Sequence, residues 1–347
     1  MKSYVFPGDI EESIREIAAN PIPYMRTADF SVVVRDIESM LLSLIHCPQG
    51  RVIPYTASGT GAMDAVVTNY VSMHNKALIL AGGAFGLRWK GLCDFYNYPN
   101  ALFEVPFGRD ADYERLEAVV AKEKPDIFLC QHHETSSGQL FDLKKISDIC
   151  THHGVSLVVD AISSFLSDPL DMDDLKIDIC IVSSQKGLNI SPGIALVFLS
   201  QRLKGISFPD KSYYFDFNEN LKNLERGQTP YSPATTLFMQ LHSRLQRNME
   251  LGVAHIIKTV STRAIYFRRL CLENGWELPV ETPSNCITGF FVHKNGDILF
   301  SELMKRGIFI MPGGVPNYFR VSHTGVQTCQ DLDKLAASIK EIENSSI

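Results

Sequence analysis

The stretch SLVVD at residues 156–160 and the stretch VSSQKGL at residues 182–188 decide how this 347-residue chain is expected to fold. The first stretch is a β-branched run that closes with Asp160, and the second begins as a strand and carries Lys186 just beyond its end. The carboxyl ends of parallel strands meet at one edge of a sheet. We therefore expect Asp160 and Lys186 to lie together at such an edge.

An aspartate and a lysine in this arrangement suit an enzyme that uses pyridoxal phosphate. The carboxylate pairs with the ring nitrogen of the cofactor, and the lysine amine forms a Schiff base with its aldehyde. Each residue alone has an ordinary explanation, because a lysine after a strand is usually a solvated loop residue and an aspartate is often a helix N-cap. The hypothesis therefore depends on further segments that meet needs of the same cofactor.

A phosphate cradle is predicted where ASGTGA, residues 57–62, joins a strand at 51–56 to a helix at 63–74. A glycine-rich turn at a helix start offers free N–H groups and the positive end of the helix dipole to an anion. The turn lacks the Gly-Lys-Ser/Thr ending of a nucleotide P-loop and the full Gly-x-Gly-x-x-Gly dinucleotide motif. A monophosphate therefore fits this turn better than a nucleotide.

Two more strands, at 77–80 and 126–131, lead into segments that suit the cofactor ring. AGGAFGLRW, residues 81–89, places Phe85 between glycines, where it can stack on a flat heterocycle, although a core role is equally plausible. HHETSSG, residues 132–138, offers Thr135 as a donor to the phenolic oxygen of the ring. Its histidines and glutamate suggest zinc, but neighbouring side chains diverge on an extended chain and no zinc-type spacing occurs, so we expect no metal.

A carboxylate anchor is predicted near the C-terminus, where YFRVSH, residues 318–323, reads as a short strand. The guanidinium of Arg320 there can hold a substrate carboxylate through two parallel hydrogen bonds. Whether Arg26 or Arg88 also enters the substrate pocket is left open by the sequence.

Taken in order, these motifs resemble the fold-type I, class V aminotransferases, most closely the alanine–glyoxylate, serine–pyruvate and serine–glyoxylate branch. The resemblance extends from FPG at residues 6–8 to FRV at 319–321. It implies that Lys186 and Asp160 are catalytic and that Gly8 and Arg320 bind the substrate. It also implies pyridoxal phosphate contacts from Ser58, Gly59, Thr60, Gly61, Ala62, Phe85, Thr135, Asp160, Gln185, Lys186, Thr229 and Ser232.

The resemblance implies an α/β fold with a large cofactor-binding domain, whose mainly parallel, seven-stranded sheet is flanked by helices, and a smaller C-terminal α+β domain. We place the large domain at residues 16–250 and the small domain at 251–347, with residues 1–15 packing against the small domain. Helical patterns occur at 113–122, 143–153, 233–251, 253–274, 297–305 and 329–342. Residues 204–228 lack periodicity and are interpreted as a long connection.

The expected reaction moves an amino group from alanine or serine to glyoxylate or pyruvate. The segment QTPYSP, residues 228–233, reads as a loop before a helix, but in similar enzymes it reaches the partner's cofactor phosphate, which implies a homodimer with shared active sites. Phe85, His133 and His323 depart from the usual residues of the branch, which leaves the substrate open. Alternatives are a 2-aminoethylphosphonate aminotransferase, a lyase or cysteine desulfurase on the same fold, and a non-catalytic ligand-binding protein.

Composition favours an ordinary soluble enzyme. The chain is 45% hydrophobic with a formal net charge of −6, which gives no reason to expect nucleic acid or anionic membranes as partners. Its eight cysteines are scattered without metal spacing, which favours reduced, buried thiols and a cytoplasmic location. No apolar stretch of about 18 residues suggests a membrane span.

Overall fold

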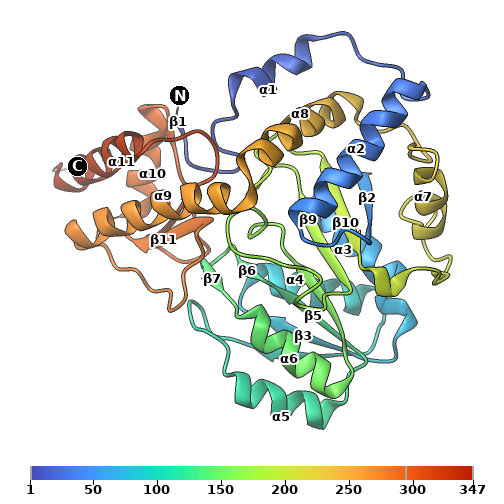
Figure 1. Ribbon diagram of the computed structural model, residues 1–347. Coiled ribbons are helices and arrows are strands. Elements are labelled where there is room, and N and C mark those ends of the chain that lie inside the picture. The colour runs from blue at the N-terminus through green and yellow to red at the C-terminus, as the bar shows by residue number, and fades with distance from the viewer. Residues whose placement is uncertain (1, 294, 346–347) are drawn as a thin grey trace.

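The computed structural model describes residues 2–293 and 295–345 (Figure 1). Its largest feature is a seven-stranded sheet in which six strands are parallel and β10 is antiparallel to both of its neighbours. This confirms the predicted α/β class with a mainly parallel sheet. In spatial order the strands are β2 (Arg51–Thr56), β10 (Ile194–Leu199), β9 (Ile179–Ser183), β8 (Ser156–Asp160), β5 (Ile127–Gln131), β3 (Ala77–Ala81) and β4 (Asn100–Glu104).

Helices cover this sheet because its strands are apolar on both faces: β3, β5, β9 and β10 are buried along their whole length. In Figure 1, α5 and α6 lie side by side at the lower edge of the molecule, and α8 lies against α2 at the top. The α-helices of this part are α1 (Glu12–Glu16), α2 (Ala28–Leu44), α3 (Gly59–Asn69), α4 (Ala84–Phe95), α5 (Tyr113–Glu123), α6 (Leu143–His153), α7 (Phe217–Leu224) and α8 (Thr235–Leu251). Short 3-10 helices are η1 (Ile17–Ala19), η2 (Val71–Met73) and η3 (Gln201–Leu203), and a two-stranded ribbon pairs β6 (His133–Glu134) with β7 (Gln139–Leu140).

A second hydrophobic core contains Tyr4 and residues from Phe267 to Ile342. It lies at the left of Figure 1, where both termini are found. Its elements are β1 (Lys2–Ser3), α9 (Val253–Glu273), β11 (Ile287–Phe291), α10 (Gly296–Lys305), β12 (Ile308–Phe309), β13 (Met311–Pro312), β14 (Tyr318–Ser322) and α11 (Cys329–Asn344). β1 pairs with β12, whereas Ile14 belongs to the first core, so the N-terminal segment joins the two cores. The division at residues 16–250 and 251–347 stays a prediction.

The expected long connection at residues 204–228 is wrong in part, because it contains helix α7. The Asp216 carboxylate caps this helix by accepting a hydrogen bond from the Glu219 N–H at 2.6 Å. Asparagines occupy two of its buried positions, and their side-chain amides donate to backbone carbonyls one turn earlier. Phe217, Leu221 and Leu224 do recur at helical spacing, but the helix has only eight residues and stands within a long polar segment, so the segment as a whole lacks periodicity.

The cysteines are free thiols, of which seven are buried and Cys329 is half-buried. Among the described residues, no helix is both long and apolar enough to cross a membrane.

Candidate functional site

The carboxyl edge of the sheet brings Asp160 and Lys186 to the same region. β8 ends at Asp160, which lies beside Ile181 of β9, and Lys186 follows β9 by three residues. Asp160 is 5% exposed, and burial raises the pKa of its carboxyl to about 7. One carboxylate oxygen accepts a hydrogen bond from the Ile162 N–H at 2.8 Å, which fixes its position.

The Lys186 amine lies 3.5 Å from the centre of the Phe6 ring. Burial lowers the pKa of this amine to about 8, and the negative charge of Asp160 opposes that shift. A lysine with this pKa is partly neutral near pH 7.5, as a proton acceptor must be. Sequence reasoning missed Phe6 as a contact of Lys186, because the two residues lie far apart along the chain.

The backbone around Lys186 forms a closed loop between β9 and β10. The Ser184 N–H donates to the Ile194 carbonyl at 2.9 Å, and the Ser184 hydroxyl donates to the Ser191 carbonyl at 2.8 Å. Within the loop, the Asn189 N–H donates to the Lys186 carbonyl at 2.9 Å. The lysine therefore projects from a hydrogen-bonded support.

The predicted phosphate cradle is the first turn of α3, which begins at Gly59 rather than at residue 63. The N-cap residue Ser58 makes no side-chain hydrogen bond to the helix, so its hydroxyl does not occupy the first N–H groups. A Cβ atom on Gly61 would lie 2.8 Å from Ala57 Cβ, so a larger residue would disturb this turn. Thr60 accepts a hydrogen bond from the Arg88 guanidinium at 3.0 Å, which brings a positive charge to the cradle. Helix geometry and charge both fit an anion.

Phe85 lies in the first turn of α4, and Glu134 caps that helix from a distant segment. The carboxylate of Glu134 accepts hydrogen bonds from the Phe85 N–H at 3.3 Å and the Gly86 N–H at 3.0 Å. The Ser136 hydroxyl donates to the same carboxylate at 2.5 Å. The Arg88 guanidinium lies over the Phe85 ring, 4.8 Å from its centre. Glu134 thus positions the predicted stacking ring, a role that sequence reasoning missed because nothing in the local pattern pairs residues 134 and 85.

Buried polar atoms without partners gather near this edge. The Thr135 hydroxyl donates to the Ser163 hydroxyl at 2.7 Å. In contrast, the side-chain amide oxygen of Gln185 and both ring nitrogens of His133 have no hydrogen-bond partner in the described parts of the chain. Burial lowers the pKa of His133 well below its usual value, so the ring is neutral. Buried polar groups are normally hydrogen-bonded, so their concentration here fits a polar ligand.

Arg320 projects from β14 toward the segment that contains Thr135. Its guanidinium donates to the Thr135 carbonyl at 2.8 Å and to the Pro312 carbonyl at 2.6 Å, while its Nε is buried without a partner within residues 2–293 and 295–345. Gly8 adopts φ +79°, and a Cβ atom there would lie 3.0 Å from the Thr324 carbonyl oxygen. Two of the five Arg320 N–H donors therefore have acceptors, and the Nε–H and the second N–H of each terminal nitrogen remain for a carboxylate.

Thr229 and Ser232 form no hydrogen bond to the other predicted site residues within the described parts of this chain. The Thr229 hydroxyl donates to the Tyr231 carbonyl at 2.7 Å. Arg26 holds the segment by donating to the Thr229 carbonyl at 2.7 Å and to the Pro230 carbonyl at 3.2 Å. Arg26 is therefore bound to this segment, whereas Arg88 lies with Thr60 and Phe85.

Cys286 lies near enough to Lys186 for an ionised thiol to interact with the charge of the amine. It is fully buried, and burial raises the pKa of its thiol to about 12. A protonated thiol at the start of a buried strand differs from the mobile, nucleophilic cysteine that a desulfurase needs. This arrangement counts against that alternative.

These features fit pyridoxal phosphate: an unfilled helix start for its phosphate, Phe85 for its ring, Asp160 for its nitrogen and Lys186 for its aldehyde. The roles of the individual residues stay predictions, and the geometry places most of them on one edge of the sheet.

Comparison with known proteins identifies the family. The family described as Aminotransferase class-V matches residues 10–210. A soluble hydrogenase small subunit from Synechococcus sp. is 28% identical over 95% of this chain and 89% of its own. A serine–glyoxylate aminotransferase from Hyphomicrobium methylovorum is 27% identical over 72% of this chain and 64% of its own. The crystal structure of an alanine–glyoxylate aminotransferase from Nostoc sp. superposes with a TM-score of 0.92 at 22% identity, covering 99% of this chain and 94% of that one.

Proposed function

The chain belongs to the class-V aminotransferases and is a pyridoxal-phosphate-dependent transaminase, and from that premise we propose that it moves amino groups between small substrates. The proposed donor is alanine or serine, and the proposed acceptor is glyoxylate or pyruvate. The observation that carries this proposal is the disposition of the arginines. Arg26 is bound to backbone carbonyls and Arg88 to Thr60 and Phe85, so Arg320 is left for the substrate's α-carboxylate, with no second arginine for a side-chain carboxylate among the three considered.

In this proposal, each residue at the sheet edge has a separate task. When bound, the cofactor accepts the electrons released as the Cα proton leaves. Asp160 keeps the ring nitrogen protonated, and its fixed position supports that charge. Lys186 takes the proton from Cα and delivers it to C4′, which suits an amine whose pKa burial has lowered. Arg320 orients the carboxylate.

A donor screen tests the proposed substrates. The cofactor-loaded enzyme is mixed with one amino donor at a time, and conversion to the pyridoxamine form is followed by absorbance. Alanine or serine should convert it, whereas conversion by 2-aminoethylphosphonate alone would assign the phosphonate alternative. No conversion with any donor would favour a ligand-binding protein.

Arg320→Lys tests the carboxylate anchor. Lysine keeps the charge but loses the paired donors, so KM for the amino donor should rise by about 10–100-fold while kcat changes less. The matched control is Arg306→Lys, since Arg306 is a half-exposed arginine of the same region paired with Glu341. An unchanged KM in Arg320→Lys would assign the carboxylate to another residue.

We further propose a homodimer in which residues 228–233 complete the partner's phosphate site. Support comes from large exposed side chains in the two stretches that bind this segment. Tyr213, whose carbonyl accepts a hydrogen bond from the Tyr231 hydroxyl, is 85% exposed, and Ile22 and Tyr24, which shortly precede Arg26, are 70% and 66% exposed. An exposed apolar group of this kind is typical of an interaction surface. Ser232 is also exposed, so it is available to a neighbouring molecule.

Subunit complementation tests the shared site. Ser232→Asp places a negative charge against a phosphate, and because Ser232 is exposed the fold should survive. Unfolding and refolding an equal mixture of Ser232→Asp and Lys186→Ala should restore about a quarter of wild-type activity, since half the dimers would carry one intact site. No recovery, or a fully active monomer, would contradict the proposal.

A further inference from the structure

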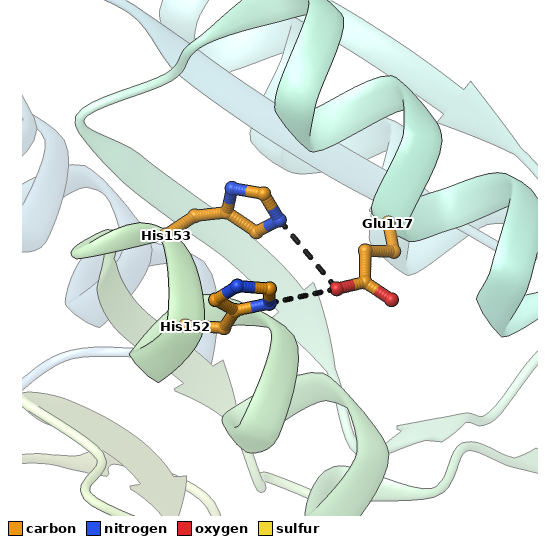
Figure 2. Close-up of side chains that lie close together, drawn as sticks. All are labelled: Glu117, His152 and His153. Carbon is orange, nitrogen blue, oxygen red and sulfur yellow. Dashed lines mark hydrogen bonds and ion pairs between the residues drawn. The ribbon is translucent and has the colours of Figure 1, made fainter.

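A cluster of metal-binding side chains lies on the outer surface, away from the site described above. Glu117 of α5 faces His152 and His153, the last two residues of α6 (Figure 2). A Glu117 carboxylate oxygen lies 2.9 Å from His152 Nδ1 and 3.6 Å from His153 Nε2. The potential ligand atoms of all three residues lie within 4.8 Å of one another.

Two neighbouring histidines can share a ligand here because they end the helix. Gly154 follows them in a left-handed conformation, φ +67°, and the two imidazole rings lie 4.7 Å apart at an interplanar angle of 35°. Figure 2 shows both rings directed at the same carboxylate. The divergence expected of adjacent residues on an extended chain, which applied to His132 and His133, therefore does not apply to this pair.

The spacing suits a small divalent ion. Zinc binds histidine nitrogen and carboxylate oxygen at about 2.0–2.2 Å, so ligand atoms of a tetrahedral site lie about 3.4 Å apart. The observed 2.9 Å and 3.6 Å lie on either side of that value. His153 Nε2 is buried and has no hydrogen-bond partner in the described parts of the chain, so its ligand position is free.

We propose that Glu117, His152 and His153 form a site for Zn²⁺ or a similar late transition-metal ion. Two nitrogen ligands exclude a preference for Ca²⁺ or Mg²⁺, which favour all-oxygen sites. The side chains of His152 and Glu117 are 72% and 45% exposed, so water completes the coordination from the solvent side.

The ion would link α5 to α6 rather than act in catalysis. α6 leads through Gly154 into β8, and the cluster lies at the amino end of that strand. Asp160 closes the opposite end, about 16 Å away for a five-residue strand. Binding should therefore stabilise the helical layer and leave turnover unchanged.

Calorimetric titration of ZnCl₂ into the cofactor-loaded full chain tests the site. Wild type should bind one ion at this site, and His153→Ala and Glu117→Gln should each weaken binding by at least about tenfold. His46→Ala is the matched control, because His46 pairs with Asp171 at 3.0 Å on the surface at comparable exposure, 53% and 41%, outside the cluster. MgCl₂ should give no comparable heat.

Thermal unfolding gives an independent readout. Zn²⁺ at about a hundredfold excess over the wild-type Kd should raise the Tm of wild type and His46→Ala by roughly 3 °C, and that of Glu117→Gln by less than about 2 °C. Equal Tm values without metal would establish that the variants fold. Equal Zn²⁺ affinity in wild type and both cluster variants would overturn the proposal.

Discussion

Replacing Lys186 with alanine is expected to abolish turnover, with a loss of about 10⁴-fold or more, and to remove the visible absorbance of the cofactor-loaded protein. In the proposed mechanism the amine both bonds the cofactor and moves the proton, and Phe6 covers it on one side. Measurement requires steady-state rates, an absorbance spectrum, and borohydride reduction followed by mass spectrometry to locate the tagged lysine.

Two further variants sharpen this test. Lys186→Arg keeps the positive charge and length but cannot form the covalent bond, so it should be as inactive as the alanine variant. Lys144→Ala removes an exposed lysine of α6 and should behave as wild type. Retained turnover in Lys186→Ala, or a borohydride tag on another lysine, would refute the assignment.

Asp160→Asn is expected to lower kcat by about 10²–10⁴-fold while cofactor binding is largely retained. Asparagine preserves the shape and can still accept the Ile162 hydrogen bond, but it lacks the charge that stabilises a protonated ring nitrogen. Asp168→Asn is the matched control, because Asp168 is a second buried carboxyl, with a pKa raised to about 6, that binds Ser284 and the Asn285 N–H. A near-wild-type rate in Asp160→Asn would mean that Asp160 is not the residue that keeps the ring nitrogen protonated.

In the cofactor-free protein, the effect of Asp160→Asn on the free energy of unfolding is expected to depend on pH. Burial raises the pKa of Asp160 to about 7 from roughly 4 in an unfolded chain, so between these values the folded state binds the proton more tightly. The Asp160 contribution to the free energy of unfolding therefore falls as pH rises from about 4 to 7. Asp160→Asn should be more stable than wild type by up to a few kcal/mol above pH 7, with the difference disappearing below pH 4. Urea unfolding across this range measures it, and the opposite sign would indicate an ionised, favourably paired Asp160.

Much of the sheet was predictable because its strands are short, apolar and closed by polar residues. The runs ending at Asp160 and near Lys186 are strands β8 and β9, and they reach the same edge because parallel strands share a direction. The helices predicted at 113–122 and 143–153 match α5 and α6 within one residue, because their apolar periodicity and their N-cap aspartates agree. The proposed site lies at this edge for the same topological reason.

The remainder depended on contacts between distant segments. Glu134 caps α4 although it follows Phe85 by 49 positions, and Phe6 contacts Lys186 although the two residues are far apart in the sequence. Neither pairing therefore leaves a local signal in the sequence. The Glu117 cluster likewise joins two helices, since Glu117 and His152 are 35 positions apart. Helix α7 was missed because its helical pattern, Phe217, Leu221 and Leu224, covers only eight residues of a long polar segment.

The closed loop around Lys186 has a kinetic consequence. Since Ser184 is tied to both Ser191 and Ile194, the main chain beneath the lysine has little freedom to shift. In the proposed mechanism, the amine would then move between the two carbons by rotation about its own side-chain bonds, without the collective domain movements that take microseconds or longer. If Lys186 has this role, proton transfer does not wait for slow rearrangements of the main chain, and the rate of turnover is set by bond breaking or by the exchange of substrates and products.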